Sequence, residues 1–176
     1  VYKERKVNRL REILINGNIE FNETESGISI SAYSPISKLA MNILGINKTY
    51  GPWLLFLSGE NLDIIIDELP LWDGHDGSYF TSKKQNAEWI QTICHLRGKA
   101  ANIAVQDNSK NPEAFGNNLI YIVNIRSTNA PATSAIIHET REVEDEIIFC
   151  PTVPSGFFMC KEAGIISVTG NSLNYD

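Results

Sequence analysis

The chain has 176 residues and a formal net charge of −6, and 43% of its residues are hydrophobic while 20% are charged. This size and composition predict one ordinary globular domain or two small ones. The sequence has no signal peptide and no apolar run of roughly 18 residues, which argues against membrane insertion. The acidic balance argues against a protein whose whole surface wraps DNA. Three scattered cysteines without a CxxC pair favour free thiols in the cytoplasm over a zinc site or a disulfide framework.

The N-terminal third predicts a helix, a β-hairpin and a second short helix. In the first segment the apolar residues Val7, Leu10 and Leu14 recur at helical spacing. Gly17 follows them at a position where glycine commonly caps the end of a helix. Apolar and polar residues then alternate in two runs within residues 19–32, as expected of a hairpin. Residues 34–55 are apolar and are interrupted by glycines and prolines, so we expect a short helix and a loop there.

The middle of the chain predicts two helices separated by a turn. The first helix carries an apolar stripe, and Pro70 should end it early because proline lacks an N–H donor. Residues 73–77, Asp-Gly-His-Asp-Gly, are ordinary turn residues. Ser82 and Gln85 have the spacing of a capping box, which predicts the start of the second helix. The residues expected on the inner face of that helix are Ala87, Ile90 and Cys94.

From residue 100 onward the sequence predicts β-structure. The runs "AANIAV", "LIYIVNI", "IIFCPTV", "GFFM" and "IISV" are short, rich in β-branched and aromatic residues, and separated by turn residues. Helices therefore dominate the first half and strands the second. The predicted fold class is α+β.

Three residues near the C-terminus, Gly170, Asn171 and Ser172, have the chemistry that self-cleavage of a peptide bond requires. Asn171 carries an amide nitrogen that can close a ring on its own backbone carbonyl and so cleave the following bond. Ser172 provides a hydroxyl nucleophile that can accept an acyl group. Gly170 can adopt the unusual dihedrals that a cyclising junction requires.

The last 31 residues, "EIIFCPTVPSGFFMCKEAGIISVTGNSLNYD", resemble the C-terminal splicing segment of inteins, especially those of phage type. The resemblance implies a splice junction between Asn171 and Ser172 and an all-β, horseshoe-shaped Hint-type splicing domain. It also implies single-turnover autocatalysis without a cofactor. Most inteins have His where Gly170 stands, so the proton donor is not identified. No upstream intein nucleophile precedes Val1, and we therefore expect an N-terminal intein fragment, or an upstream intein portion, as partner.

Cys150 and Thr169 match further positions of the intein pattern. Cys150 stands where many inteins have an Asp or Cys that acts on the upstream junction, and in one intein class that Cys is the first nucleophile. Thr169 stands where the same class has Thr. The alternative for Cys150 is a small apolar residue buried in a strand, since a reactive thiol needs a lowered pKa.

Residues 53–126 are similar to the core of LAGLIDADG homing endonucleases, and residues 3–32 match the end of a preceding repeat. The resemblance implies that the first of the two central helices ends at Asp73, followed by Gly74, and that Asp73 binds a divalent metal such as Mg²⁺ beside a DNA phosphate. The sequence departs from this family at Asp67, Glu68 and Pro70, and it has one such motif where the family needs two. The alternative for Asp73 is a turn residue.

These resemblances divide the chain into three predicted parts. Residues 1–130 form a partial, degenerate LAGLIDADG region, residues 131–171 the intein splicing segment, and residues 172–176 the start of the host protein. The predicted function is that of a C-terminal intein fragment in protein splicing, and the alternative is a homing endonuclease that binds or cleaves DNA. We expect the nuclease to be inactive and DNA to bind weakly, with Mg²⁺ needed only if it is active. A third possibility is an α+β domain with an accidental "TGNS" tail.

Overall fold

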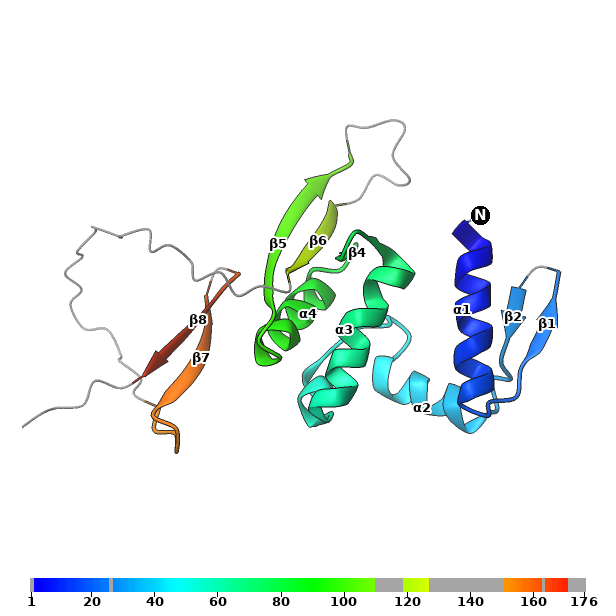
Figure 1. Ribbon diagram of the computed structural model, residues 1–176, viewed down its shortest axis with the longest axis horizontal. Coiled ribbons are helices and arrows are strands. Elements are labelled where there is room, and N and C mark those ends of the chain that lie inside the picture. The colour runs from blue at the N-terminus through cyan, green and yellow to red at the C-terminus, as the bar shows by residue number, and fades with distance from the viewer. Residues whose placement is uncertain (1, 26, 110–118, 127–150, 163, 171–176) are drawn as a thin grey trace, which may run out of the picture.

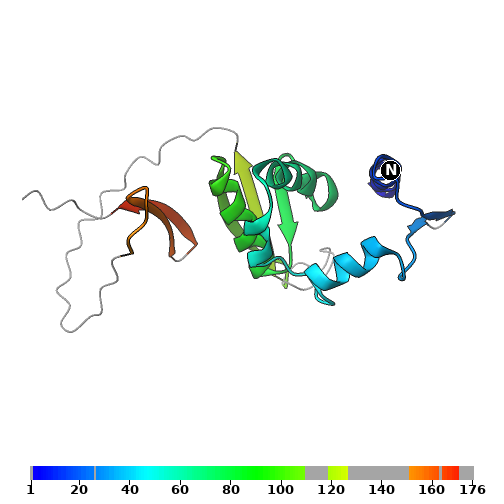
Figure 2. The ribbon, with the colours of Figure 1, turned by 90° about the horizontal axis from the view of Figure 1, so that it is seen from below.

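The computed structural model of the chain describes residues 2–25, 27–109, 119–126, 151–162 and 164–170. These residues form a mixed α+β structure, as the sequence predicts. Figure 1 shows a helix and a small hairpin at one end, a helix-and-sheet unit in the middle, and a second hairpin at the other end. The same order is visible from below in Figure 2.

The N-terminal part consists of α1 (Tyr2–Asn16) and the antiparallel strands β1 (Asn22–Thr24) and β2 (Gly27–Ser29). The predicted helix and hairpin are therefore confirmed, with shorter strands than the alternation suggested. The chain turns away from α1 at Asn18, whose φ of 50° is in the left-handed region. The left-handed residue at the helix end is therefore Asn18 and not the predicted cap, Gly17. Gly17 precedes it and donates its N–H to the carbonyl of Ile13 at 2.9 Å.

Two short helical elements connect this part to the centre. The helix α2 (Pro35–Leu44) begins with a proline in its first turn, and the hydroxyl of Ser34 accepts the N–H of Ser37 at 3.2 Å as an N-cap. No residue of α2 is buried. The 3₁₀ helix η1 (Pro52–Phe56) follows, and its Leu54 is fully buried in the central core.

The central unit contains two helices and a four-stranded sheet. The elements are α3 (Gly59–Asp73), β3 (Gly74–His75), β4 (Ser78–Thr81), α4 (Lys84–Leu96), β5 (Ala100–Asp107) and β6 (Leu119–Arg126). The sheet order is β3-β4-β6-β5 and all neighbours are antiparallel. Both helices pack on one face of this sheet, where Tyr79, Ala101 and Val123 point into the core. The helical side of the core includes the predicted inner-face residues Ala87, Ile90 and Cys94, all fully buried.

Two details of the central helices differ from the sequence prediction. Pro70 does not end α3, which continues to Asp73. In the last turn of the helix, Arg5 Nη2 donates to the exposed carbonyl of Leu71 at 2.6 Å. The capping box at the start of α4 is absent, since Lys83 precedes the helix without a side-chain cap. Gln85 instead donates its side-chain amide to the carbonyl of Tyr50 at 2.7 Å.

The C-terminal hairpin is formed by β7 (Phe157–Glu162) and β8 (Ile165–Gly170). Both strands were predicted, and Gly164 in the turn has a φ of 82°. The predicted run at 147–153 is not a strand over residues 151–153, and its first four residues lie outside the described part of the chain. Gln91 of α4 connects the hairpin to the central unit by donating to the carbonyl of Gly164 at 2.9 Å.

Candidate functional site

An open apolar groove lies between α2 and α3. Its volume is about 330 Å³, and α2 and α3 provide opposite walls that Tyr50 and Trp53 join. The α2 wall is formed by Ile36, Leu39, Ala40, Ile43 and Leu44, and the α3 wall by Ile65, Glu68, Leu69 and Trp72. Leu39 remains 52% exposed, so the groove is an apolar surface without a cover among the described residues.

Glu68 is the one carboxylate among the described residues that line this groove, and neighbouring side chains bind it. Arg9 donates to the Glu68 carboxylate through both Nε and Nη2, and Trp72 Nε1 donates to it at 3.1 Å. The hydrogen bond from Arg9 lowers the pKa of the Glu68 carboxyl, and the bond from Trp72 adds to this effect. The groove therefore presents apolar side chains beside a carboxylate that already has its partners.

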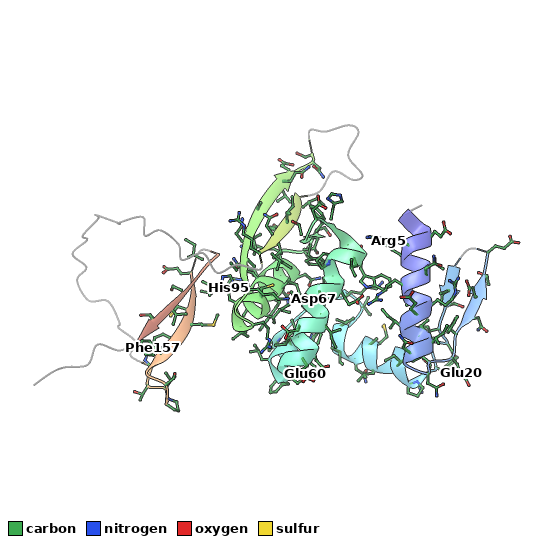
Figure 3. All side chains as sticks on the ribbon, in the orientation of Figure 1. Arg5, Glu20, Glu60, Asp67, His95 and Phe157 are labelled. Carbon is green, nitrogen blue, oxygen red and sulfur yellow. The ribbon has the colours of Figure 1, made fainter. Side chains whose placement is uncertain are left out.

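Polar contacts connect α1 to the same helix α3. Besides the Arg9–Glu68 pair, Lys6 Nζ lies 3.0 Å from Asp73 Oδ1, and Arg5 reaches the carbonyl of Leu71. Arg5 lies on the side of α1 that faces α3 (Figure 3). These contacts place α1 beside the C-terminal half of α3, outside the groove lining.

Asp73 does not have the surroundings of a divalent-metal ligand. Its side chain is 67% exposed, and the closest charged partner is the Lys6 ammonium, a cation that competes with a metal ion. Within the described ranges, no group of three or more His, Cys, Asp or Glu side chains is placed to hold a metal. The described residues thus provide no partner ligands for Mg²⁺ at Asp73. Asp73 is the last residue of α3, and the turn between β3 and β4 is formed by Asp76 and Gly77.

Of the five residues predicted for peptide-bond cleavage, the structure describes Thr169 and Gly170. Asn171, Ser172 and Cys150 are outside the described residues. Thr169 and Gly170 are the last residues of β8, paired with Phe158 and Phe157 of β7.

Gly170 does not have the unusual dihedrals that we expected, since it is not among the glycines with positive φ. A Cβ at this position would lie 2.7 Å from the carbonyl oxygen of Gly156. Glycine is required there by close backbone approach.

The basic residues near α4 are engaged within the chain. Arg97 forms a two-bond pair with Asp63 at 2.8 and 3.0 Å, and Lys99 Nζ lies 2.7 Å from Asp67. Asp67 is therefore an exposed ion-pair partner. DNA as a weak partner stays a prediction.

Comparisons with known proteins provide one distant relative. The chain is 24% identical to a protein of Aquifex aeolicus named ribonucleoside-diphosphate reductase subunit beta, over 96% of this chain. The chain spans about a quarter of the length of that relative. It matches no known protein-family model and no solved structure. No helix in the described part of the chain combines the length and apolar character needed to cross a membrane.

This relative corrects the function predicted from the sequence. Its name points to a function other than protein splicing by Asn171 and Ser172, and other than DNA cleavage by a homing endonuclease. Neither function is carried forward for this chain.

The groove was not predicted from the sequence, although the apolar spacing that forms one of its walls can be read there. Ile36, Leu39 and Ile43 are spaced three and four residues apart and so share one helix face. The sequence predicted α2 as a short helix but did not predict that its apolar face would lie open. Glu68, which we regarded as an obstacle to helix packing, is held by Arg9 at the edge of this groove.

Proposed function

We propose that this chain is an accessory, protein-binding part of a longer polypeptide related to ribonucleoside-diphosphate reductase subunit beta. In this proposal the α2–α3 groove binds the apolar face of an amphipathic helix from another part of the same polypeptide. The observation that carries the proposal is the apolar helix α2, which has no buried residue.

The energetics of α2 support an occupant. A helix as short as α2 is marginal in water, because isolated helices gain most of their stability by packing an apolar face. Here the apolar face of α2 forms one wall of the groove and stays open. Its residues Ile36, Leu39 and Ile43 are between 38% and 52% exposed. A helix laid into the groove would bury these side chains and stabilise α2 at the same time.

The proposed occupant is a segment of the longer polypeptide, since the chain corresponds to about a quarter of the matched relative and three quarters lie elsewhere. An apolar helix face fits better than an acidic or basic one, because the one carboxylate of the groove, Glu68, is already bound by Arg9 and Trp72. The free thiols of Cys94 and Cys160 are consistent with the reducing, cytoplasmic setting that we expect for it.

At the level of fold alone, we also propose that the central unit has a LAGLIDADG-type arrangement and that β7–β8 belongs to a Hint-type strand set. The order helix-strand-strand, which occurs at α3-β3-β4 and again at α4-β5-β6, supports the first likeness. The similarity of the last 31 residues to the C-terminal segment of inteins supports the second likeness. No function is attached to these likenesses.

The proposal is tested with two matched variants of α2. Leu39→Asp places a charge in the groove, whereas Met41→Asp changes a residue of similar exposure, 56% against 52%, that does not line it. A capped, Leu-rich amphipathic peptide of about 15 residues serves as the model helix. Its binding is followed by the fluorescence of Trp53 and Trp72 in the groove, and binding of the separately expressed remainder of the polypeptide is measured in parallel.

We expect Leu39→Asp to weaken both interactions at least about tenfold, which corresponds to about 1.4 kcal/mol, while Met41→Asp leaves them unchanged. Equal binding by the two variants would contradict the proposal. Sedimentation that shows a dimer closed through the groove would also contradict it, since the occupant would then be a second copy.

A further inference from the structure

A second cavity lies on the other side of the central unit, between α4, the sheet and the C-terminal hairpin. Its volume is about 790 Å³. Lys84, Glu88, Trp89 and Thr92 of α4 form one wall; Ile103, Val105 and Tyr121 of the sheet form another; Lys161 and Gly164 of the hairpin complete it with Leu55. This volume is within the usual range of small-molecule sites, about 300–1,000 Å³.

Two hydrogen bonds hold the hairpin over the cavity. Gln91 is 3% exposed and donates to the carbonyl of Gly164, and Lys161 Nζ donates to the carbonyl of Glu88 at 3.0 Å. The cavity is therefore built from three segments far apart in the sequence and is complete only when the hairpin is docked.

The aromatic and apolar residues of the cavity suit a planar ring. Val105 and Tyr121 are directly opposite in the β5–β6 register and so present their side chains on the same face of the sheet. Trp89 faces the cavity from α4. Rings of Trp and Tyr bind planar aromatic ligands by stacking, which tolerates many ring types.

The charged residues of the cavity suit an anion. Two ammonium groups, Lys84 and Lys161, line it with one carboxylate, Glu88, which lies 3.7 Å from Lys84. Burial lowers the pKa of Lys161, and the charge of Lys84 lowers it further against the opposing effect of Glu88. An anion between the two lysines would relieve their repulsion. A phosphate fits better than a carboxylate because its charge of about −1.5 to −2 can engage both ammonium groups.

We propose that this cavity binds a planar aromatic ring that carries a phosphate group, the chemistry of a nucleotide. The ring lies against Trp89 and Tyr121, and the phosphate is held between Lys84 and Lys161. This site is separate from the α2–α3 groove and shares none of its lining residues.

The test uses calorimetric titration of the full chain with AMP, and with adenosine and inorganic phosphate as the ring and anion alone. Val105→Glu adds a negative charge to the cavity wall. Ala104→Glu adds the same charge to the neighbouring exposed residue of β5, whose side chain points to the opposite face of the sheet. Circular dichroism melting checks that both variants are folded, and neither residue forms the two hydrogen bonds that hold the hairpin.

We expect AMP to bind at least about tenfold more tightly than adenosine or phosphate, and Val105→Glu to weaken AMP binding about tenfold through charge repulsion. Ala104→Glu should bind like the unmodified chain. The proposal is overturned if AMP does not bind, if phosphate alone binds as tightly, or if the two folded variants behave alike.

Discussion

Gly74 and Gly170 are required by close contacts with backbone atoms. A Cβ on Gly74 would lie 1.9 Å from the carbonyl oxygen of Ser78 and 2.8 Å from the Cα of Pro70. The φ of Gly74 is −166°, an extended value that any residue can adopt. The Asp-Gly pair at 73–74 was predicted from turn chemistry, but the tight packing of β3 between α3 and β4 is a tertiary feature that the local sequence does not contain.

We predict that Gly74→Ala destabilises the chain by about 3 kcal/mol or more, because backbone atoms cannot move away from the new methyl group as a flexible side chain can. The measurement is the free energy of unfolding from urea denaturation. The matched control is Gly51→Ala, where the nearest atom to a Cβ lies 3.5 Å away and belongs to the Trp53 side chain. If Gly74→Ala loses as little stability as the control, the backbone at the α3–β3 junction has room for a methyl group and the prediction is wrong.

At the scale of elements, helix and strand positions and the end of α1 followed from local patterns, whereas the capping at the start of α4 did not. The inner face of α4 was correct because Ala87, Ile90 and Cys94 recur at helical spacing. The start of α4 was wrong because Gln85 binds the carbonyl of Tyr50, a residue 35 positions earlier in the chain. The Gln85 side chain could form either a capping box or a hydrogen bond to a distant residue. The sequence alone does not show that Tyr50 lies close enough to Gln85 for the second.

Gln91 connects two elements, and we predict that Gln91→Met loosens the hairpin. Its buried amide donates to Ala101 at 3.2 Å as well as to Gly164, so methionine would leave two carbonyls without this donor, at a cost of about 1–3 kcal/mol. Hydrogen exchange of the β7–β8 amides should accelerate, with little change in β6. Gln106→Met, at an exposed position of β5, serves as control, and unchanged exchange in both variants would mean that other contacts dock the hairpin.

Across the whole molecule, the parts differ in how they are joined. The central unit has an apolar core of α3, α4 and the sheet, whereas ion pairs join α1 to α3 and two described hydrogen bonds join the hairpin to α4. The sequence predicted the α+β class and most elements because periodicity is local. It did not predict the α2–α3 groove, because that site depends on how α2 lies against Trp72 and Leu69, some thirty residues later.

The ionic attachment of α1 leads to a pH prediction. Arg9 lowers the pKa of Glu68 in the folded chain, so the folded state binds fewer protons at this group than the unfolded chain does. The stabilisation is therefore present above the ordinary glutamate pKa of about 4.3 and is lost as the pH falls through the lower, folded value. We expect α1 to separate from α3 in this acidic range, before the apolar core unfolds.

Trp72 reports this event, since its indole N–H donates to Glu68 and its emission should change when the carboxylate is protonated. Glu68→Gln should remove the acidic transition in Trp72 fluorescence, because glutamine does not titrate. Glu60→Gln, in the first turn of α3, should keep the transition. A transition that persists unchanged in Glu68→Gln would assign the acid sensitivity to another group and would leave the Arg9–Glu68 pair without a part in holding α1.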